Sequence, residues 1–167
     1  MYFNDASRIF ILLAVDEVEE LRYLVLAAQR DGNRLLAALL RPFGLTPAQS
    51  EVLTVLAGAE RPLTVREVGD LLVCEPGSPS RLVTSLADAG HVVRRPHLQD
   101  GRAAALELTD QGRRRAEQVR AVEERFHDEL RARMTSQRDI AATVRTLRAI
   151  ASDGASAGAL ERRLRPR

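Results

Sequence analysis

Apolar residues recur at helical spacing along most of the chain. From about residue 17 to 41 they form a stripe with a polar opposite face, which Pro42 and Gly44 end. Two further stripes, over about 110–134 and 136–151, each begin at a hydroxyl residue that suits a helix N-cap. The pattern therefore predicts long helices in both halves of a mainly α-helical protein.

Two shorter helices are predicted after the first stripe, and each begins with a capping box. Thr46 is followed by Gln49, and Thr64 is followed by Glu67, so that side chain and backbone can exchange hydrogen bonds at each helix start. The predicted helices cover about residues 47–57 and 65–73.

A further helix is predicted from Ser78, its N-cap, to Gly90, which suits a left-handed helix end. Beyond Gly90 the pattern changes to short alternating runs. Strands are expected at 91–95 and 103–108, with a polar hairpin tip at 96–102 between them. Two compact helices followed at once by such a hairpin are typical of a winged helix-turn-helix.

The expected fold class is mainly α with a small β-hairpin wing. It combines a winged helix-turn-helix DNA-binding domain with a helical dimerisation region. The expected divisions are an N-terminal dimerisation helix region at 1–44, the DNA-binding domain at 45–112, C-terminal dimerisation helices at 113–152, and a disordered basic tail at 153–167.

Composition excludes several other classes of protein. The 167 residues, 45% of them hydrophobic, suit one globular domain with a proper core. The early apolar run Ile9–Val15 is too short to span a bilayer and lacks the flanks of a signal peptide. We therefore expect a cytoplasmic protein with no membrane partner.

The sequence offers no set of residues for catalysis or metal binding. Cys74 is the one cysteine, so an internal disulfide is excluded, and the three histidines lie apart from any second ligand. No nucleophile, base and metal ligand are predicted to converge. We therefore expect no cofactor and no enzymatic activity.

The net charge of +2 does not by itself indicate a nucleic-acid partner. All 25 basic residues are arginine, a bias that GC-rich coding explains. Each arginine is nevertheless a planar fork that can bind a phosphate or a guanine edge at two points.

Three groups of residues carry a family resemblance. They are Leu45-Thr46-Pro47-Ala48-Gln49; Ser80-Arg81-Leu82-Val83 with Leu86-Ala87-Asp88-Ala89-Gly90; and Asp100-Gly101-Arg102 with Leu106-Glu107-Leu108-Thr109 and Gly112. In this order and spacing they resemble the MarR family in motif detail over residues 45–112, and the flanking helices fit in pattern. The resemblance implies a homodimer that binds a pseudo-palindromic double-stranded DNA operator, most often as a repressor, and a small-molecule effector that releases it.

A recognition helix reads the major groove from residues near its N-terminus. Arg81 is the residue of this helix that can bind guanine at two points, and the alternative is a phosphate or an acidic neighbour. The full set of residues predicted to contact DNA is Thr64, Ser78, Pro79, Ser80, Arg81, Thr84, Ser85, Arg94, Arg95, His97, Asp100 and Arg102.

At the wing tip, Arg102 is expected to enter the minor groove, with Asp100 holding it through a charge-assisted hydrogen bond. The alternative is a solvated hairpin tip. For Arg94, Arg95 and His97 the alternatives are phosphate contacts or ordinary surface charge. The proline-bracketed run Glu75-Pro76-Gly77-Ser78-Pro79 departs from the usual family pattern, which leaves open the DNA sequence that is read.

The apolar stripes of the first helix and of the last two helices predict packing across a twofold axis, with folding back onto their own domain as the alternative. Phe10, Arg41 and Phe43 are candidates for an effector crevice, but the effector remains unassigned. Cys74 is interpreted as a packing residue, with redox sensing as the alternative because it precedes the recognition helix.

A different class of function is a winged-helix module that binds protein without specific DNA binding. Such a module would carry hydrophobic residues on the outward face of the recognition helix. The sequence instead places serine, threonine and arginine there, which favours DNA.

Overall fold

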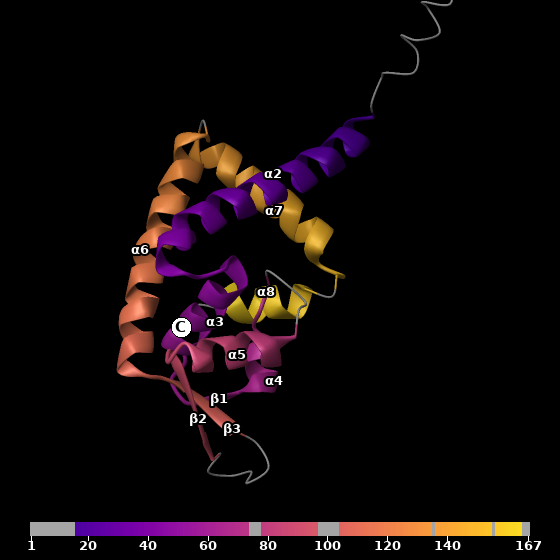
Figure 1. Cartoon of the computed structure of the whole chain (residues 1–167). Helices are drawn as coiled ribbons and strands as arrows, with labels where there is room; N and C mark the ends of the chain where they lie inside the picture. The colour runs from indigo at the N-terminus through magenta and orange to yellow at the C-terminus, as the bar shows by residue number, and fades with distance from the viewer. Residues whose placement is uncertain (1–15, 74–77, 97–103, 135, 155, 165–167) are drawn as a thin grey trace, which may run out of the picture. The chain divides into compact units, whose positions relative to one another are not determined.

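The computed structural model describes residues 16–73, 78–96, 104–134, 136–154 and 156–164 (Figure 1). Its elements are α2 (Glu17–Leu40), η1 (Arg41–Phe43), α3 (Pro47–Ala57), β1 (Leu63–Thr64), α4 (Val65–Gly69), α5 (Pro79–Asp88), β2 (Val92–Pro96), β3 (Ala104–Leu108), α6 (Asp110–Ala132), α7 (Gln137–Ala151) and α8 (Ala157–Leu164). The chain divides into two compact units, residues 1–35 and 36–167. Predominant helix with one small antiparallel sheet confirms the predicted fold class.

Both predicted capping boxes are present. The Thr46 hydroxyl accepts a hydrogen bond from the Gln49 backbone N–H at 3.2 Å, and Gln49 Oε1 accepts one from the Thr46 N–H at 2.9 Å. Thr64 and Glu67 make the same exchange at the start of α4. A side-chain hydrogen bond from Arg61 is the main reason that the pKa of the Glu67 carboxyl is lowered to about 2. Helices α3 and α4 therefore begin where the sequence predicts.

Helix α4 is shorter than the sequence pattern predicts, because it ends at Gly69 and not near Val73. The cause is the close approach of the next helix. A Cβ atom at Gly69 would lie 2.8 Å from Cγ of Pro79, the first residue of α5. The chain therefore leaves α4 where the first turn of α5 packs against it.

Helix α5 begins directly after Ser78, as predicted, although the Ser78 side chain makes no capping hydrogen bond. Gly90 adopts the left-handed conformation with φ of +74°. The backbone N–H groups of Gly90 and His91 donate to the carbonyls of Ala87 and Leu86, each at 2.9 Å. This pairing is a Schellman motif, and it confirms Gly90 as the end of the helix.

The sheet contains one more strand than the sequence pattern reveals. Strands β2 and β3 form the predicted hairpin within one residue of the expected ends, and β1 pairs with β3 through Leu63 opposite Leu106 and Thr64 opposite Ala105. The sheet is antiparallel in the order β1-β3-β2. Two residues are too few to show an alternating pattern, which is why β1 was not predicted.

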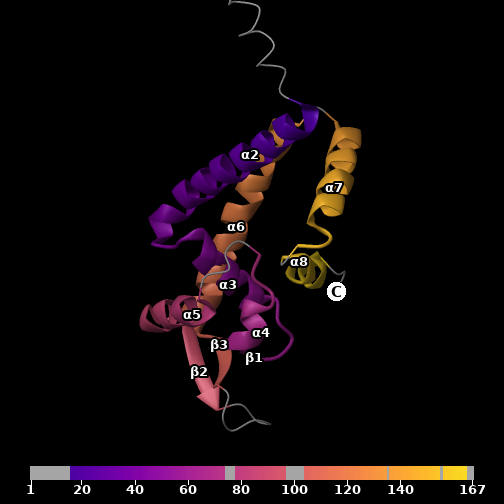
Figure 2. The ribbon, with the colours of Figure 1, turned by 90° about the vertical axis from the view of Figure 1, so that its right-hand side faces the viewer.

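The hydrophobic core lies among α3, α5, the sheet and α6 (Figure 2). Its largest fully buried apolar side chains are Leu40, Val52, Leu53, Val68, Val83, Leu86, Leu106 and Val119. Val83 and Leu86 pack α5 against the core, so that the opposite face of α5 is exposed.

The end of α5 and the start of α6 meet at His91. The His91 carbonyl accepts a hydrogen bond from the Thr109 N–H at 3.1 Å, and the Thr109 hydroxyl caps α6 by accepting from the Gly112 N–H at 3.0 Å. The same hydroxyl donates to the Gly90 carbonyl at 2.6 Å. Gly112 packs so closely against the His91 carbonyl that a Cβ atom there would overlap it.

The composition of residues 153–167 predicts a disordered tail, but the structure has helix α8 within it. Ala159 of α8 is buried, and the Arg162 guanidinium donates to the backbone carbonyl of Asp70. Ala157, Leu160 and Leu164 recur at helical spacing in α8, but a stripe of eight residues is too short to outweigh the small, polar and basic composition of the segment.

Two sets of large apolar side chains are exposed, one in each unit. In the first unit they lie on α2 and are Val18, Leu21, Tyr23, Leu24, Val25 and Leu26. In the second unit the exposed set on α7 is Val144, Leu147 and Ile150. None of the helices in the described ranges is long and apolar enough to cross a membrane.

Replacing Gly112 with alanine should destabilise the protein severely. The added methyl group must displace the His91 backbone, which the Schellman motif and Thr109 hold in place, so we expect a loss of about 3 kcal/mol or more in the free energy of unfolding. Urea titration followed by circular dichroism measures this loss. Gly154→Ala is the matched control, because its new methyl group would meet only an ordinary contact at 3.7 Å. Equal stability of the two variants would contradict the close packing at Gly112.

The stability of the protein should also depend on the ionisation of His91. Its side chain is 5% exposed, and burial together with the charge of Arg115 lowers its pKa below the ordinary value of 6.5. The unfolded chain therefore binds a proton at His91 more readily than the folded chain does. The part of the free energy of unfolding that depends on neutral His91 is complete above about pH 6.5 and is lost as the pH falls below that value. Urea unfolding between about pH 7.5 and about pH 5.5 should show the loss, and His91→Leu should flatten the profile. His127→Gln, a change at an exposed histidine, should leave the profile unchanged. If the free energy of unfolding of His91→Leu still fell steeply as the pH was lowered, the pH dependence would come from another group.

Candidate nucleic-acid interface

The outward face of α5 carries short polar side chains and one arginine. The exposed residues that line a shallow surface cleft of about 410 Å³ on this face are Ser80, Arg81, Thr84, Ser85 and Asp88. Apart from Asp88, these are residues that the sequence predicts to contact DNA. The structure thus brings four of the predicted residues together on one helix face.

Arg81 is the exposed cation of this face. It makes no ion pair with any residue in the part of the chain that the structure describes. The acidic neighbour considered as an alternative partner is therefore not observed there. Its guanidinium is open to a phosphate or a base edge.

Ser85 is held by a hydrogen bond from α3. The Gln49 side chain donates from Nε2 to Ser85 Oγ at 2.9 Å, while its Oε1 accepts from the Thr46 N–H. A single amide thus caps α3 and fixes one residue on the outward face of α5. The capping role is visible in the sequence, but the bond to Ser85 joins residues 36 positions apart and leaves no local signal.

Thr84 is connected to the hairpin. Arg94 Nη2 donates to Thr84 Oγ1 at 2.8 Å. Arg94 lies opposite Leu106 in the β2–β3 register, so both side chains are on the sheet face that packs against α5. Arg94, for which the sequence predicts a phosphate contact, therefore links the hairpin to α5.

Ser78, directly before α5, is exposed and its side chain makes no capping hydrogen bond, whereas Arg95, Thr64 and Pro79 have internal partners. Arg95 pairs with Glu107 on the other face of the sheet at 3.1 Å, and both side chains are exposed, so the pair contributes little to stability. The Thr64 hydroxyl is bound to Glu67, and Pro79 packs against Gly69. Thr64 and Pro79 thus make contacts inside the helix-turn-helix that stabilise it.

Several predicted residues lie outside the described residues. They are His97, Asp100 and Arg102 at the hairpin tip, Cys74 with the run Glu75-Pro76-Gly77 before α5, and Phe10.

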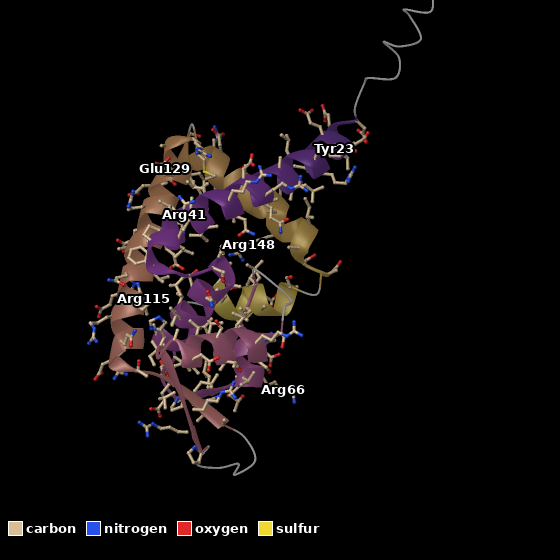
Figure 3. All side chains as sticks on the ribbon, viewed as in Figure 1. Tyr23, Arg41, Arg66, Arg115, Glu129 and Arg148 are labelled. Carbon is tan, nitrogen blue, oxygen red and sulfur yellow. The ribbon has the colours of Figure 1, made fainter. Side chains whose placement is uncertain are left out.

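Arg66 is an exposed cation that is not among the residues predicted from the sequence to contact DNA. It lies on α4, and Figure 3 shows its side chain projecting away from the ribbon.

Of the three candidates for an effector crevice, Phe43 and Arg41 lie in the described residues. Phe43 is half-buried, and the guanidinium of Arg115, which projects from α6, lies 5.7 Å from the centre of its ring (Figure 3). Arg41 is exposed in η1. A separate cleft of about 540 Å³ lies between α3 and α6, where Thr54, Arg113 and Arg120 contribute polar groups.

This arrangement matches known regulators. A MarR family model matches residues 43–103, which extend from the end of η1 into the hairpin. An uncharacterized HTH-type transcriptional regulator of Bacillus cereus is 35% identical over 80 residues, or 48% of this chain. The chain spans about half the length of the curated relatives it matches, 52% for this one.

Solved structures extend the match beyond residues 43–103. A variant of MarR from E. coli, in complex with operator DNA, is 30% identical, has a TM-score of 0.67, and is matched over 94% of its length and 80% of this chain. The organohalide-sensing regulator RdhR, in its 2,4-dichlorophenol-bound form, has a TM-score of 0.74 at 17% identity. It is matched over 83% of its length and 84% of this chain, and it shows likeness in fold alone. Because E. coli MarR is related at this identity over nearly its whole length, the chain belongs to the MarR family of winged-helix transcriptional regulators, which are not enzymes.

Proposed function

We propose that the protein is a homodimer that binds a specific, pseudo-palindromic double-stranded DNA sequence and represses transcription there. The observation that carries this proposal is the outward face of α5, which is polar, exposed and held by bonds from α3 and the hairpin. The complex of the related E. coli MarR with operator DNA supports it.

The polar face of α5 suits the major groove. Small hydroxyl side chains allow the helix backbone to approach the base edges, and Arg81 can bind guanine O6 and N7 together. Ser85 and Thr84 are already held by Gln49 and Arg94, so less side-chain freedom is lost when DNA binds. A protein-binding module would need apolar side chains on this face.

The hairpin is proposed to lie against the adjacent minor groove. Arg102 and Asp100 at its tip keep the roles given by the family resemblance, with the arginine in the groove and the aspartate orienting it. Arg94 and His97 would contact the phosphates. Arg95, paired with Glu107, would contribute mainly to the local positive potential.

Dimerisation is proposed to use regions 1–44 and 113–152, outside the DNA-binding domain at 45–112. The exposed apolar side chains of α2 and α7 are the surface that a second copy would cover. Two copies related by a twofold axis would place two α5 helices on half-sites about one helical turn of DNA apart.

Release by a small molecule is proposed as the regulatory step, although its chemical class is not assigned. RdhR, which has the same fold, is solved with 2,4-dichlorophenol bound. A ligand that favours a different spacing of the two α5 helices would shift the population away from the DNA-competent form.

The DNA-binding proposal is tested by selecting a duplex from a random pool and titrating it with the full-length protein. We expect binding tighter than to a scrambled duplex by about a thousandfold or more, with affinity falling steeply as salt rises. Arg81→Ala should weaken binding to the selected duplex by about tenfold to a hundredfold and relax the preference at one base position. Arg125→Ala is the matched control, because Arg125 is exposed on α6 about 22 Å along the helix from its start. A folded protein that selects no sequence would favour a protein-binding module.

Dimerisation is tested by placing a charge on the exposed apolar face of α7. Leu147, 39% exposed, is replaced by glutamate, and we expect dissociation of a dimer of two 18.5 kDa chains in sedimentation velocity measurements. Ala142→Glu introduces the same charge on the opposite side of α7 and should leave the dimer intact. A wild-type chain that sediments as a monomer at micromolar concentration would contradict the dimer.

A further inference from the structure

The last described helix, α8, contacts the helix-turn-helix through two adjacent arginines. Arg162 donates from Nε and Nη2 to the backbone carbonyl of Asp70, at 3.0 and 2.6 Å. Asp70 is the C-cap of α4, where helix carbonyls lack partners within the helix. The guanidinium fork therefore supplies two charge-assisted bonds to the carbonyl at the end of α4.

The second arginine approaches a buried acid. Arg163 Nη1 lies 3.8 Å from Glu51 Oε1, and Glu51, on α3, is 6% exposed. The same carboxylate oxygen accepts the backbone N–H of Val73 at 2.8 Å. Charged and hydrogen-bonding partners of this kind offset the cost of burying a carboxylate.

These contacts fall at both ends of one short segment. Arg162 binds the carbonyl at Asp70, and Arg163 approaches the acid that holds the amide of Val73. Residues 70–73 leave α4 toward α5, whose first residue packs on the end of α4. The position of this segment therefore constrains where α5 lies relative to α4.

Two small residues of α8 allow Arg162 to lie close to residues 70–73. Ala159 is buried, and Gly158 lies one turn before Arg162, where an added Cβ would come within 3.3 Å of Arg162 Nη1. The glycine thus leaves room for the guanidinium to lie along the helix. Figure 2 shows α8 and α5 on opposite sides of α3.

We propose that α8 is a positioning element for DNA recognition, in which Arg162 and Arg163 fix residues 70–73 and thereby preorganise α5 for the major groove. The inference rests on the proposed function for its effect on DNA. The docking of α8 itself is independent of that function. Neither arginine contacts DNA in this arrangement.

The test uses full-length Arg162→Ala and Arg163→Ala proteins, with Glu161→Ala on the exposed side of α8 as the matched control. Hydrogen exchange without DNA is measured at the Val73 amide. Loss of a charge-assisted contact should speed this exchange by about tenfold in the two arginine variants and leave the control unchanged. Unchanged exchange at Val73 in both arginine variants would overturn the docking.

The second measurement is the affinity for the selected duplex at several salt concentrations. We expect about tenfold weaker binding for the two arginine variants, with the slope of log affinity against log salt equal to that of the wild type. A slope smaller by about one would show that the arginine contacts a phosphate directly, and would overturn the positioning role. Unchanged affinity despite faster exchange at Val73 would overturn it as well. A wild-type protein that binds no DNA, with the exchange difference intact, would refute the proposed function and leave only the docking.

Discussion

The arrangement of the winged helix-turn-helix depends on the close contact between Gly112 and the His91 carbonyl. His91 follows Gly90, the left-handed stop of α5, and directly precedes β2, while Gly112 lies in the first turn of α6. Thr109 ties the two together by bonding to both sides of the contact. Helix α5, the hairpin and α6 are thus fixed relative to one another by a few backbone groups and one residue without a side chain.

Around this contact, the polar residues of α5 are held by partners that are themselves structural. Gln49 caps α3 and binds Ser85, and Arg94 bridges from β2 to Thr84. Side chains that are already ordered lose less conformational freedom when a ligand binds. The face of α5 is therefore organised before any DNA is present, and its geometry depends on α3 and on the sheet as much as on α5 itself.

The sequence predicts the parts of this fold that are encoded locally. Capping at Thr46 and Thr64 and the left-handed stop at Gly90 need only neighbouring residues, so their positions follow from the sequence. The end of α4 and the strand β1 depend on contacts with distant segments, and the apolar stripe of α8 is only eight residues long. Of the candidate site, the outward face of α5 follows from helical periodicity. The bonds that hold it, from Gln49 and Arg94, are tertiary and have no signature in the sequence.

The strand order also has a consequence for how the protein behaves at high concentration. β3 lies in the middle of the sheet, so the edge that the hairpin presents to solvent belongs to β2. An open strand edge is a template on which another chain can add a strand. β2 ends in Pro96, which has no N–H to donate, and carries the cations Arg94 and Arg95 just before it. The residues that suit this hairpin to a polyanion thus also protect its edge from self-association.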